Sequence, residues 1–469
     1  MSATKTQMSA TEIAAIILAA GKGTRMKSAT HKVLHPIGGR PMIGHLLASL
    51  AEIETARNVV VVGALKEQVE AEVPGAAIAV QEPQLGTGHA VLAARDAMAG
   101  FDGDVLILYG DVPFVAPETL RSMIDARRDG ADLVVLGFRP ADPAAYGRLV
   151  QNSDGSLARI VEFKDATEAE RAIGLCNSGV MAADCAHLFA LLDHVTNDNA
   201  KGEYYLTDIV ELAVGAGGRV AVVEAPEAEV IGINSRAELA EAEAVFQAGA
   251  RVDAMANGAT LINPESVFFT FDTEVGRDVT IGPNVVFGPG VRIADRVTIH
   301  AFSHIEGAEI AAGAVVGPFA RLRPGAKLGE GAKVGNFVEV KNAIISAGAK
   351  ANHLSYIGDA WVGAAANIGA GTITCNYDGF NKYLTVIGDG AFIGSNSTLV
   401  PPVTIDAGGL TAAGSVITKD VGKDTIGLGR AGQENKEGAA ARFRERKAAE
   451  KKAGKWPKPD PAALEKNDG

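Results

Sequence analysis

The 469-residue chain has little cysteine, few aromatic residues and no excess of basic charge. Its three cysteines, Cys176, Cys185 and Cys375, form an odd and scattered set, which excludes a disulfide framework and suits a reducing compartment. Lys and Arg total 44 against 56 Asp and Glu, so a net charge of -12 leaves no general basic surface for a polyanion. We therefore expect no nucleic-acid partner.

Long hydrophobic runs are also missing. The longest run, at 13–20, is too short to cross a bilayer, and the first residues contain no apolar core of signal-peptide length. The sequence therefore predicts a soluble cytoplasmic protein without membrane insertion. At about 100–200 residues per domain, the length of the chain argues for two to four domains.

The first half alternates short apolar runs with segments of helical period. Runs of β-branched residues at 58–63, 104–109 and 131–136 suit strands that helices cover on both faces. Residues 1–234 are therefore expected to form a Rossmann-like α/β domain with a mostly parallel sheet. Ser235 and Glu238 form a capping-box pair, which predicts a linker helix over 235–258.

The second half changes to a period of six. Such a period fits neither an α-helix nor a plain hairpin, but it is typical of a parallel β-helix, an all-β fold whose triangular coils have 18 residues. We expect this β-helix over 259–435, with its aliphatic and aromatic side chains stacked inside. The repeat begins with Val275, Ile281, Phe287, Ile293, Ile299 and Ile305.

Three features interrupt or end the repeat. One-residue slips near Gly307, Asn342 and Gly358 indicate tight corners, and the polar stretch 374–385 predicts a loop that leaves the coil. The charged segment 436–469 has little to bury and predicts a disordered or helical tail.

Two glycine-rich turns in the first half are candidate ligand sites. The first, Leu18-Ala-Ala-Gly-Lys-Gly-Thr-Arg-Met26, follows a strand, where backbone N–H groups can approach a phosphate and Arg25 and Lys32 supply charge. It lacks the complete dinucleotide and P-loop patterns, so an ordinary strand–turn–helix connection is an equal alternative. The second turn, at 84–90, opens a helix and can hold a base together with Gln81.

Asp111 follows a strand, at the edge where open α/β sheets bind ligands. Capping of the next helix is the simpler alternative. In the β-helix, Arg323 and Lys341 are 18 residues apart, so two cations stack at about 4.8 Å and an anion between them would relieve repulsion. Solvated basic side chains are the alternative. His353 lies close by in sequence, and a neutral imidazole is a suitable general base for an amine.

Taken together, these motifs resemble the sugar-1-phosphate nucleotidyltransferases, and with the hexapeptide half they resemble the bacterial bifunctional UDP-N-acetylglucosamine pyrophosphorylases/glucosamine-1-phosphate N-acetyltransferases. The resemblance implies uridylyl transfer from UTP to N-acetylglucosamine 1-phosphate, with Mg²⁺ on Asp111 and Asn234 and with catalytic Arg25 and Lys32. It implies that Lys32, Asp111 and Asn234 also contact substrate. The residues of the uridine and sugar pockets would be Leu18, Ala19, Ala20, Gly21, Gln81, Gly86, Thr87, Tyr109, Gly110, Gly147, Glu162 and Asn177. The segment 203–208 also matches the family and receives no catalytic role.

For the second half, the resemblance implies acetyl transfer from acetyl-CoA to glucosamine 1-phosphate, a left-handed β-helix and a homotrimer with acetyl-CoA between neighbouring prisms. His353 would be the catalytic base, with Arg323, Lys341, Tyr356 and Asn367 around the sugar phosphate. Acetyl-CoA would contact Ala370, Asn376, Tyr377, Ser395, Ala413 and Arg430. A non-catalytic β-helical oligomerisation domain is the main alternative, and a nicotinamide-dependent oxidoreductase with a β-helical appendage is a weaker one.

Overall fold

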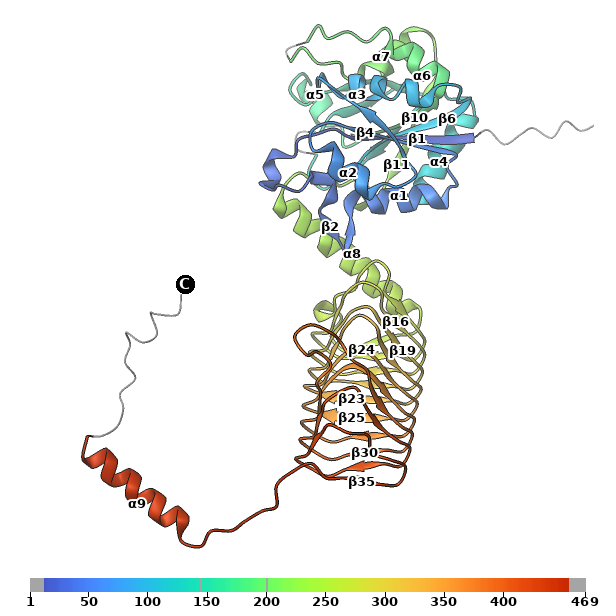
Figure 1. The fold of residues 1–469 in the computed structure, drawn as a ribbon. Helices are drawn as coiled ribbons and strands as arrows, with labels where there is room; N and C mark the ends of the chain where they lie inside the picture. The colour runs from blue at the N-terminus through green and yellow to red at the C-terminus, as the bar shows by residue number, and fades with distance from the viewer. Residues whose placement is uncertain (1–11, 144–145, 200, 455–469) are drawn as a thin grey trace, which may run out of the picture.

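The computed structural model describes residues 12–143, 146–199 and 201–454. Figure 1 shows an α/β body and a β-helical prism joined by the helix α8 (Arg236–Ala256), with the helix α9 (Ala439–Lys452) beyond the prism. No residue of α9 is buried. The remainder of the predicted tail, 455–469, lies outside the described residues, as does 1–11. Within the described ranges, no helix is long and apolar enough to span a bilayer.

The α/β body is built on one sheet. Its main strands are parallel except for β10, which runs antiparallel to both of its neighbours. In sheet order they are β11 (Val220–Ala225), β7 (Leu133–Phe138), β10 (Cys176–Asp184), β6 (Gly103–Tyr109), β1 (Glu12–Ala19), β4 (Arg57–Val62) and β5 (Ala77–Val80). A hairpin of β8 (Arg148–Gln151) and β9 (Leu157–Val161) attaches to β10. The predicted mostly parallel α/β sheet is confirmed.

Helices cover this sheet on both faces, which explains its continuous apolar strands. Successive β1 residues face opposite cores: Ile16 belongs to one hydrophobic cluster and Ile17 to the other. One cluster includes α3 (Thr87–Ala93), α6 (Cys185–Leu192) and α7 (Asp208–Gly215). The other includes α1 (Met42–Glu52), α2 (Lys66–Glu72) and α4 (Pro117–Arg128).

The prism consists of short parallel strands, and most of its successive coils pair 17 or 18 residues apart. Ile281 pairs with Ile299, which pairs with Val316. One sheet contains β12 (Thr260–Leu261), β14 (Thr280–Ile281), β17 (Thr298–Ile299), β20 (Val315–Val316), β23 (Lys333–Asn336), β25 (Lys350–His353), β27 (Asn367–Ile368), β30 (Phe392–Ile393), β33 (Leu410–Thr411) and β35 (Ile426–Gly427). The predicted six-residue pattern is confirmed: of its first members, Val275 is partly buried and the others are fully buried.

The other prism strands form a second sheet that covers two faces of the coil. It is continuous because β24 (Glu339–Ile345) and β26 (Tyr356–Val362) run through one edge. Its remaining strands are β13 (Glu274–Val275), β15 (Val286–Phe287), β16 (Arg292–Ile293), β18 (His304–Ile305), β19 (Ala308–Ile310), β21 (Arg321–Leu322), β22 (Ala326–Leu328), β28 (Ile373–Thr374), β29 (Thr385–Ile387), β31 (Thr398–Leu399), β32 (Val403–Ile405) and β34 (Val416–Ile417).

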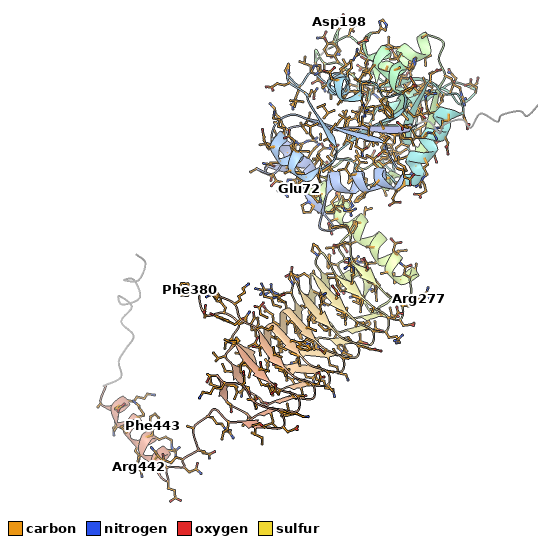
Figure 2. The ribbon with its side chains drawn as sticks, turned by 45° about the vertical axis from the view of Figure 1, so that its right-hand side comes forward. Glu72, Asp198, Arg277, Phe380, Arg442 and Phe443 are labelled. Atoms are coloured by element: carbon orange, nitrogen blue, oxygen red, sulfur yellow. The ribbon has the colours of Figure 1, made fainter. Side chains whose placement is uncertain are left out.

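We call that edge the loop edge, because an insertion leaves the prism there. The backbone turns through positive φ at Gly307, Asn342 and Asp359, where the one-residue slips occur. The next coil is longer: Trp361 pairs with Val386, 25 residues on. The extra residues form the predicted extruded loop, and Figure 2 shows Phe380, which is 90% exposed, standing away from the prism.

A second edge carries a ladder of exposed aromatic rings that is not among the predictions. Phe302, Phe319 and Phe337 all have positive φ, and their ring centroids lie 4.9 and 5.2 Å apart. Each ring is about half exposed. Positive φ costs a non-glycine residue about 1–2 kcal/mol, so stacking offsets only part of this strain. We call this edge, which continues through Leu354 to Gly414, the ladder edge.

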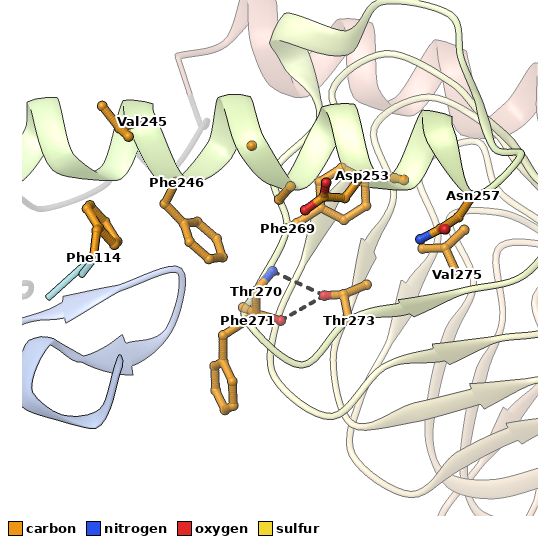
Figure 3. A pocket seen from close by; sticks show the side chains of 13 residues that line it. Phe114, Val245, Phe246, Asp253, Asn257, Phe269, Thr270, Phe271, Thr273 and Val275 are labelled. Atoms are coloured by element: carbon orange, nitrogen blue, oxygen red, sulfur yellow. Dashed lines mark hydrogen bonds between the residues drawn. The ribbon is translucent and has the colours of Figure 1, made fainter. Parts of the chain in front are cut away.

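The helix α8 is hydrogen-bonded to both the α/β body and the prism. The predicted capping box of Ser235 and Glu238 is confirmed at its start. Near the middle of the helix, the Gln247 amide exchanges two hydrogen bonds with the backbone of Phe269, at 2.7 and 2.9 Å. Toward the sheet, Glu243 accepts a hydrogen bond from the Gly38 N–H. Figure 3 shows the cavity of about 390 Å³ that remains between α8, the first coils and Phe114.

Replacement of Ile299 by alanine tests the stacked interior. Ile299 is 1% exposed, so the variant should lose about 2–5 kcal/mol of free energy of unfolding through lost burial and an unfilled cavity. Thr298→Ala on the same strand is the control and should lose under about 1 kcal/mol. Guanidinium unfolding of the full chain, followed by circular dichroism, measures both. Equal losses would show that the interior stack does not stabilise the prism.

Candidate functional site

The carboxyl ends of β1 and β6 lie side by side at the ligand edge of the sheet. The N–H of Gly110 donates to the carbonyl oxygen of Leu18 at 3.0 Å. Leu18, Ala19 and Ala20 are buried, whereas Gly21 is exposed at the start of the first glycine-rich turn. The Gln84 amide donates to the carbonyl of Ala20, so the two predicted turns are in direct contact.

The second turn is held from both sides. Gln81 is buried and its amide donates to the Gly86 carbonyl at 2.9 Å. From the other side, the Tyr204 carbonyl accepts from the Gly88 N–H at 2.8 Å, and the Leu206 N–H donates to the Thr87 hydroxyl at 3.0 Å. The segment 203–208 therefore clamps this turn, a supporting role that its match to the family did not reveal.

Lys32 joins the two predicted metal ligands. Its Nζ donates to Asp111 Oδ2 and, at 3.0 Å, to Asn234 Oδ1. The Ile233 N–H donates to the Asp111 carbonyl at 2.9 Å, which holds the two segments together. Two oxygen atoms from distant parts of the sequence thus converge on one cation. Among the described residues, no group of three or more His, Cys, Asp or Glu could hold a metal ion.

Arg25 is not part of this contact. It lies on the short 3-10 helix η1 (Thr24–Met26), and its side chain is exposed. The structure therefore brings Lys32, Asp111 and Asn234 together and leaves Arg25 on the solvent side of the turn.

The predicted sugar-pocket residues gather beside Asp111. The Asn177 N–H donates to the Gly147 carbonyl at 2.9 Å, and Gly147 faces the Glu162 carboxylate. Burial raises the pKa of the Tyr109 phenol far above its ordinary value, and the charges of Asp111 and Glu162 raise it further. Tyr109 therefore stays neutral and can donate a hydrogen bond.

In the prism, Arg323 and Lys341 occupy neighbouring positions on successive coils, next to the loop edge. Their strands pair through Leu322 and Val340. The charge of Arg323 is not isolated, because Glu339 Oε1 accepts from Arg323 Nη1 at 2.9 Å and this bond raises the pKa of Arg323. Glu339 is absent from the predicted residues; its spacing of 16 residues from Arg323, close to one coil, is the signal that identifies it.

The Tyr356 ring extends toward the same edge. A Cβ added at Gly358, the coil partner of Lys341, would lie 2.5 Å from the Tyr356 hydroxyl oxygen and 2.9 Å from Asn376 Nδ2. Arg323, Lys341, Tyr356 and Asn376 thus share one end of this face.

His353 lies at the opposite end of the face, on the ladder edge. It is exposed, and the carbonyl of its coil neighbour Asn336 accepts from the Leu354 N–H at 3.0 Å. Below His353, the same edge carries most of the predicted acetyl-CoA residues in one stripe, linked by backbone hydrogen bonds between successive coils. They are Ala370, Ser395, Ala413 and, at the end of the stripe beside Gly414, Arg430.

The remaining predicted residues of the prism lie elsewhere. Asn376 Nδ2 donates to the Asp359 carboxylate at the loop edge, and Tyr377 is 59% exposed on the extruded loop. Asn367 begins β27, in the sheet that does not contain Lys341 and Tyr356. One chain therefore presents the predicted acetyl-CoA residues on two different edges.

Two family models match the chain. A MobA-like NTP transferase domain matches residues 15–172, and a bacterial transferase hexapeptide (six repeats) matches residues 272–307. Over 447 residues the chain is 62% identical to the bifunctional protein GlmU of Sphingopyxis alaskensis and 64% identical to that of Rhizorhabdus wittichii, covering 94% of this chain and 99% of each relative. It is 61% identical over 436 residues to the bifunctional protein GlmU of Rhodospirillum rubrum, covering 92% of this chain and 98% of the relative.

Gly86→Ala should open the clamp on the second turn. Gly86 has φ +108, and an added Cβ would lie 2.6 Å from the Tyr204 carbonyl oxygen. Gly75→Ala is the matched control, because Gly75 also has positive φ but nothing lies within 4 Å. Hydrogen exchange followed by mass spectrometry should show about 10-fold or greater loss of amide protection at 86–92 and 203–208 in Gly86→Ala only. Unchanged protection there would contradict the clamp.

Proposed function

Because the chain belongs to the family of bifunctional GlmU proteins, we propose that each of its two bodies carries one of two consecutive reactions. The enzyme transfers an acetyl group from acetyl-CoA to glucosamine 1-phosphate. It then transfers a uridylyl group from UTP to N-acetylglucosamine 1-phosphate, with release of pyrophosphate. The single observation that carries the division is that the cation site and the imidazole lie on different bodies.

The α/β body performs uridylyl transfer. A phosphate oxygen of the sugar attacks the α-phosphorus of UTP, the new P–O bond forms and the bond to pyrophosphate breaks. Leu18 to Gly21, Gln81, Gly86 and Thr87 would hold the uridine, because both glycine-rich turns meet at this edge. Tyr109, Gly110, Gly147, Glu162 and Asn177 would hold the acetylated sugar. The reaction brings anions together, so charge compensation and alignment supply most of the rate enhancement.

Mg²⁺ fits the position that Lys32 Nζ occupies in this structure. Asp111 Oδ2 and Asn234 Oδ1 converge there on one cationic nitrogen, and Mg²⁺ prefers oxygen ligands while keeping several waters. Asp111 and Asn234 would hold the ion, which when bound would neutralise charge on the phosphates. With the ion in this place, Lys32 would be free to contact the phosphates, and Arg25 would approach them from the exposed turn.

The prism performs acetyl transfer. His353 removes a proton from the amine of glucosamine 1-phosphate, the nitrogen attacks the thioester carbonyl, and the C–S bond breaks to release coenzyme A. Arg323 and Lys341 hold the phosphate at the other end of the same face. The strand segment from Tyr356 to Gly358 lies on this face between the His353 end and the end with the two cations. It spans about 7 Å, a width that one amino sugar and the flanking side chains can bridge.

A homotrimer would complete this site. The acetyl-CoA residues lie on two edges of one chain, so a neighbouring copy can supply Asn376 and Tyr377, and in the same way Asn367. The exposed rings of Phe302, Phe319 and Phe337 lie on the ladder edge above His353, and an apolar row of this kind is a typical protein contact. The co-substrates acetyl-CoA and UTP fit a cytoplasmic enzyme, and so do the free thiols of Cys176, Cys185 and Cys375.

Crossed variants test this division of labour. His353→Ala should lower acetyl transfer about 10²–10⁴-fold through loss of the general base and leave uridylyl transfer unchanged. Asp111→Ala should do the reverse. His304→Ala, another exposed imidazole on the prism, is the control and should retain both activities.

Separate assays with glucosamine 1-phosphate plus acetyl-CoA, and with N-acetylglucosamine 1-phosphate plus UTP, give the two rates. Full acetylation by His353→Ala would exclude this base. If the unaltered enzyme forms no acetylated sugar phosphate, the prism is an oligomerisation scaffold.

A further inference from the structure

We propose that Asn336 is a positioning residue that fixes the tautomer and orientation of His353, so that Nε2 is the ring atom that accepts the proton of the substrate amine. This inference rests on the proposed role of His353 as base. It concerns how one ring nitrogen is selected.

The contact is short and built into the coil. Asn336 Oδ1 lies 2.8 Å from His353 Nδ1. The two residues are direct partners in the parallel pairing of β23 with β25, and the Leu354 N–H donates to the Asn336 carbonyl at 3.0 Å. Phe337 and Leu354, the residues that follow them, both have positive φ, so both backbones turn the ladder edge in the same way. The register therefore keeps the amide beside the imidazole.

An amide oxygen can only accept a hydrogen bond. Facing Asn336 Oδ1, His353 Nδ1 must therefore carry the hydrogen, and in a neutral imidazole this leaves the lone pair on Nε2. The opposite tautomer would place its lone pair against the amide oxygen and a hydrogen on Nε2, which could not accept a proton. Selection of the tautomer by a neighbouring acceptor is a general way to prepare an imidazole base.

The Asn336 side chain also limits rotation of the His353 imidazole. His353 is exposed and would otherwise sample several orientations on the surface of the prism. The hydrogen bond to Asn336 fixes the ring relative to the face that carries Tyr356 and Lys341. Loss of this bond should therefore lower kcat more than it raises KM for glucosamine 1-phosphate.

Two substitutions at Asn336 separate acceptance of the hydrogen bond from packing. Asn336→Leu keeps a similar size without an acceptor and should lower kcat for acetyl transfer about 10–100-fold at nearly unchanged KM. Asn336→Asp keeps an acceptor oxygen and should retain kcat to within a few-fold. Asn352→Leu, a partly buried position on β25, is the matched control and should retain full activity.

The tautomer itself is measured on the unaltered enzyme. Solid-state ¹⁵N spectra of histidine-labelled protein at high pH, with His353→Gln to identify the signal, should show hydrogen on Nδ1 of His353. The Asn336→Leu variant should show a mixture of tautomers, while its uridylyl transfer and its assembly state stay unchanged.

A hydrogen on Nε2 in the unaltered enzyme, or full acetyl transfer by Asn336→Leu, would overturn the inference. So would equal losses in Asn336→Leu and Asn336→Asp, because packing would then explain both. These outcomes differ from failure of the proposed function, in which His353→Ala itself would remain active.

Discussion

The parallel pairing between successive coils is the constraint on which the second half of the molecule depends. Most residues of the prism lie beside the residue 17 or 18 positions later, so residues far apart in sequence form columns on three faces and three edges. This pairing turns a repeat of small and aliphatic residues into a rigid surface on which polar side chains are placed in rows. His353 owes its place next to Asn336, and Arg323 its place next to Lys341, to this register alone.

The first half relies on a different constraint, the meeting of strand ends at one edge of a parallel sheet. Lys32, Asp111 and Asn234 come from three segments, yet one ammonium group contacts both oxygen atoms. Asn234 directly precedes the capping box of α8, and α8 is bonded through Gln247 to the first coils of the prism. The proposed metal ligand Asn234 and the junction between the two bodies are thus parts of one continuous segment.

The fold follows from the sequence because periodicity reports burial directly. The six-residue repeat identifies the interior of the prism, and Ser235 with Glu238 marks the start of α8. The edges are harder to predict, because one-residue slips at Gly307, Asn342 and Asp359 and a 25-residue coil shift the columns. The resemblance places acetyl-CoA between neighbouring prisms, but only the register shows that the predicted acetyl-CoA residues of one chain are divided between the ladder edge and the loop edge. Glu339 and Asn336 are found only once the register is known.

The division of one site between two edges is most directly tested by mixing subunits. His353→Ala and the double variant Asn376→Ala/Tyr377→Ala would be co-expressed with different tags, and oligomers that carry both tags would be assayed for acetyl transfer. If each site combines the ladder edge of one copy with the loop edge of another, every trimer that carries both tags has one intact site among three. About a third of the unaltered activity should therefore return. Each variant alone should be nearly inactive. Mixed oligomers no more active than the mean of the two parents would contradict a shared site.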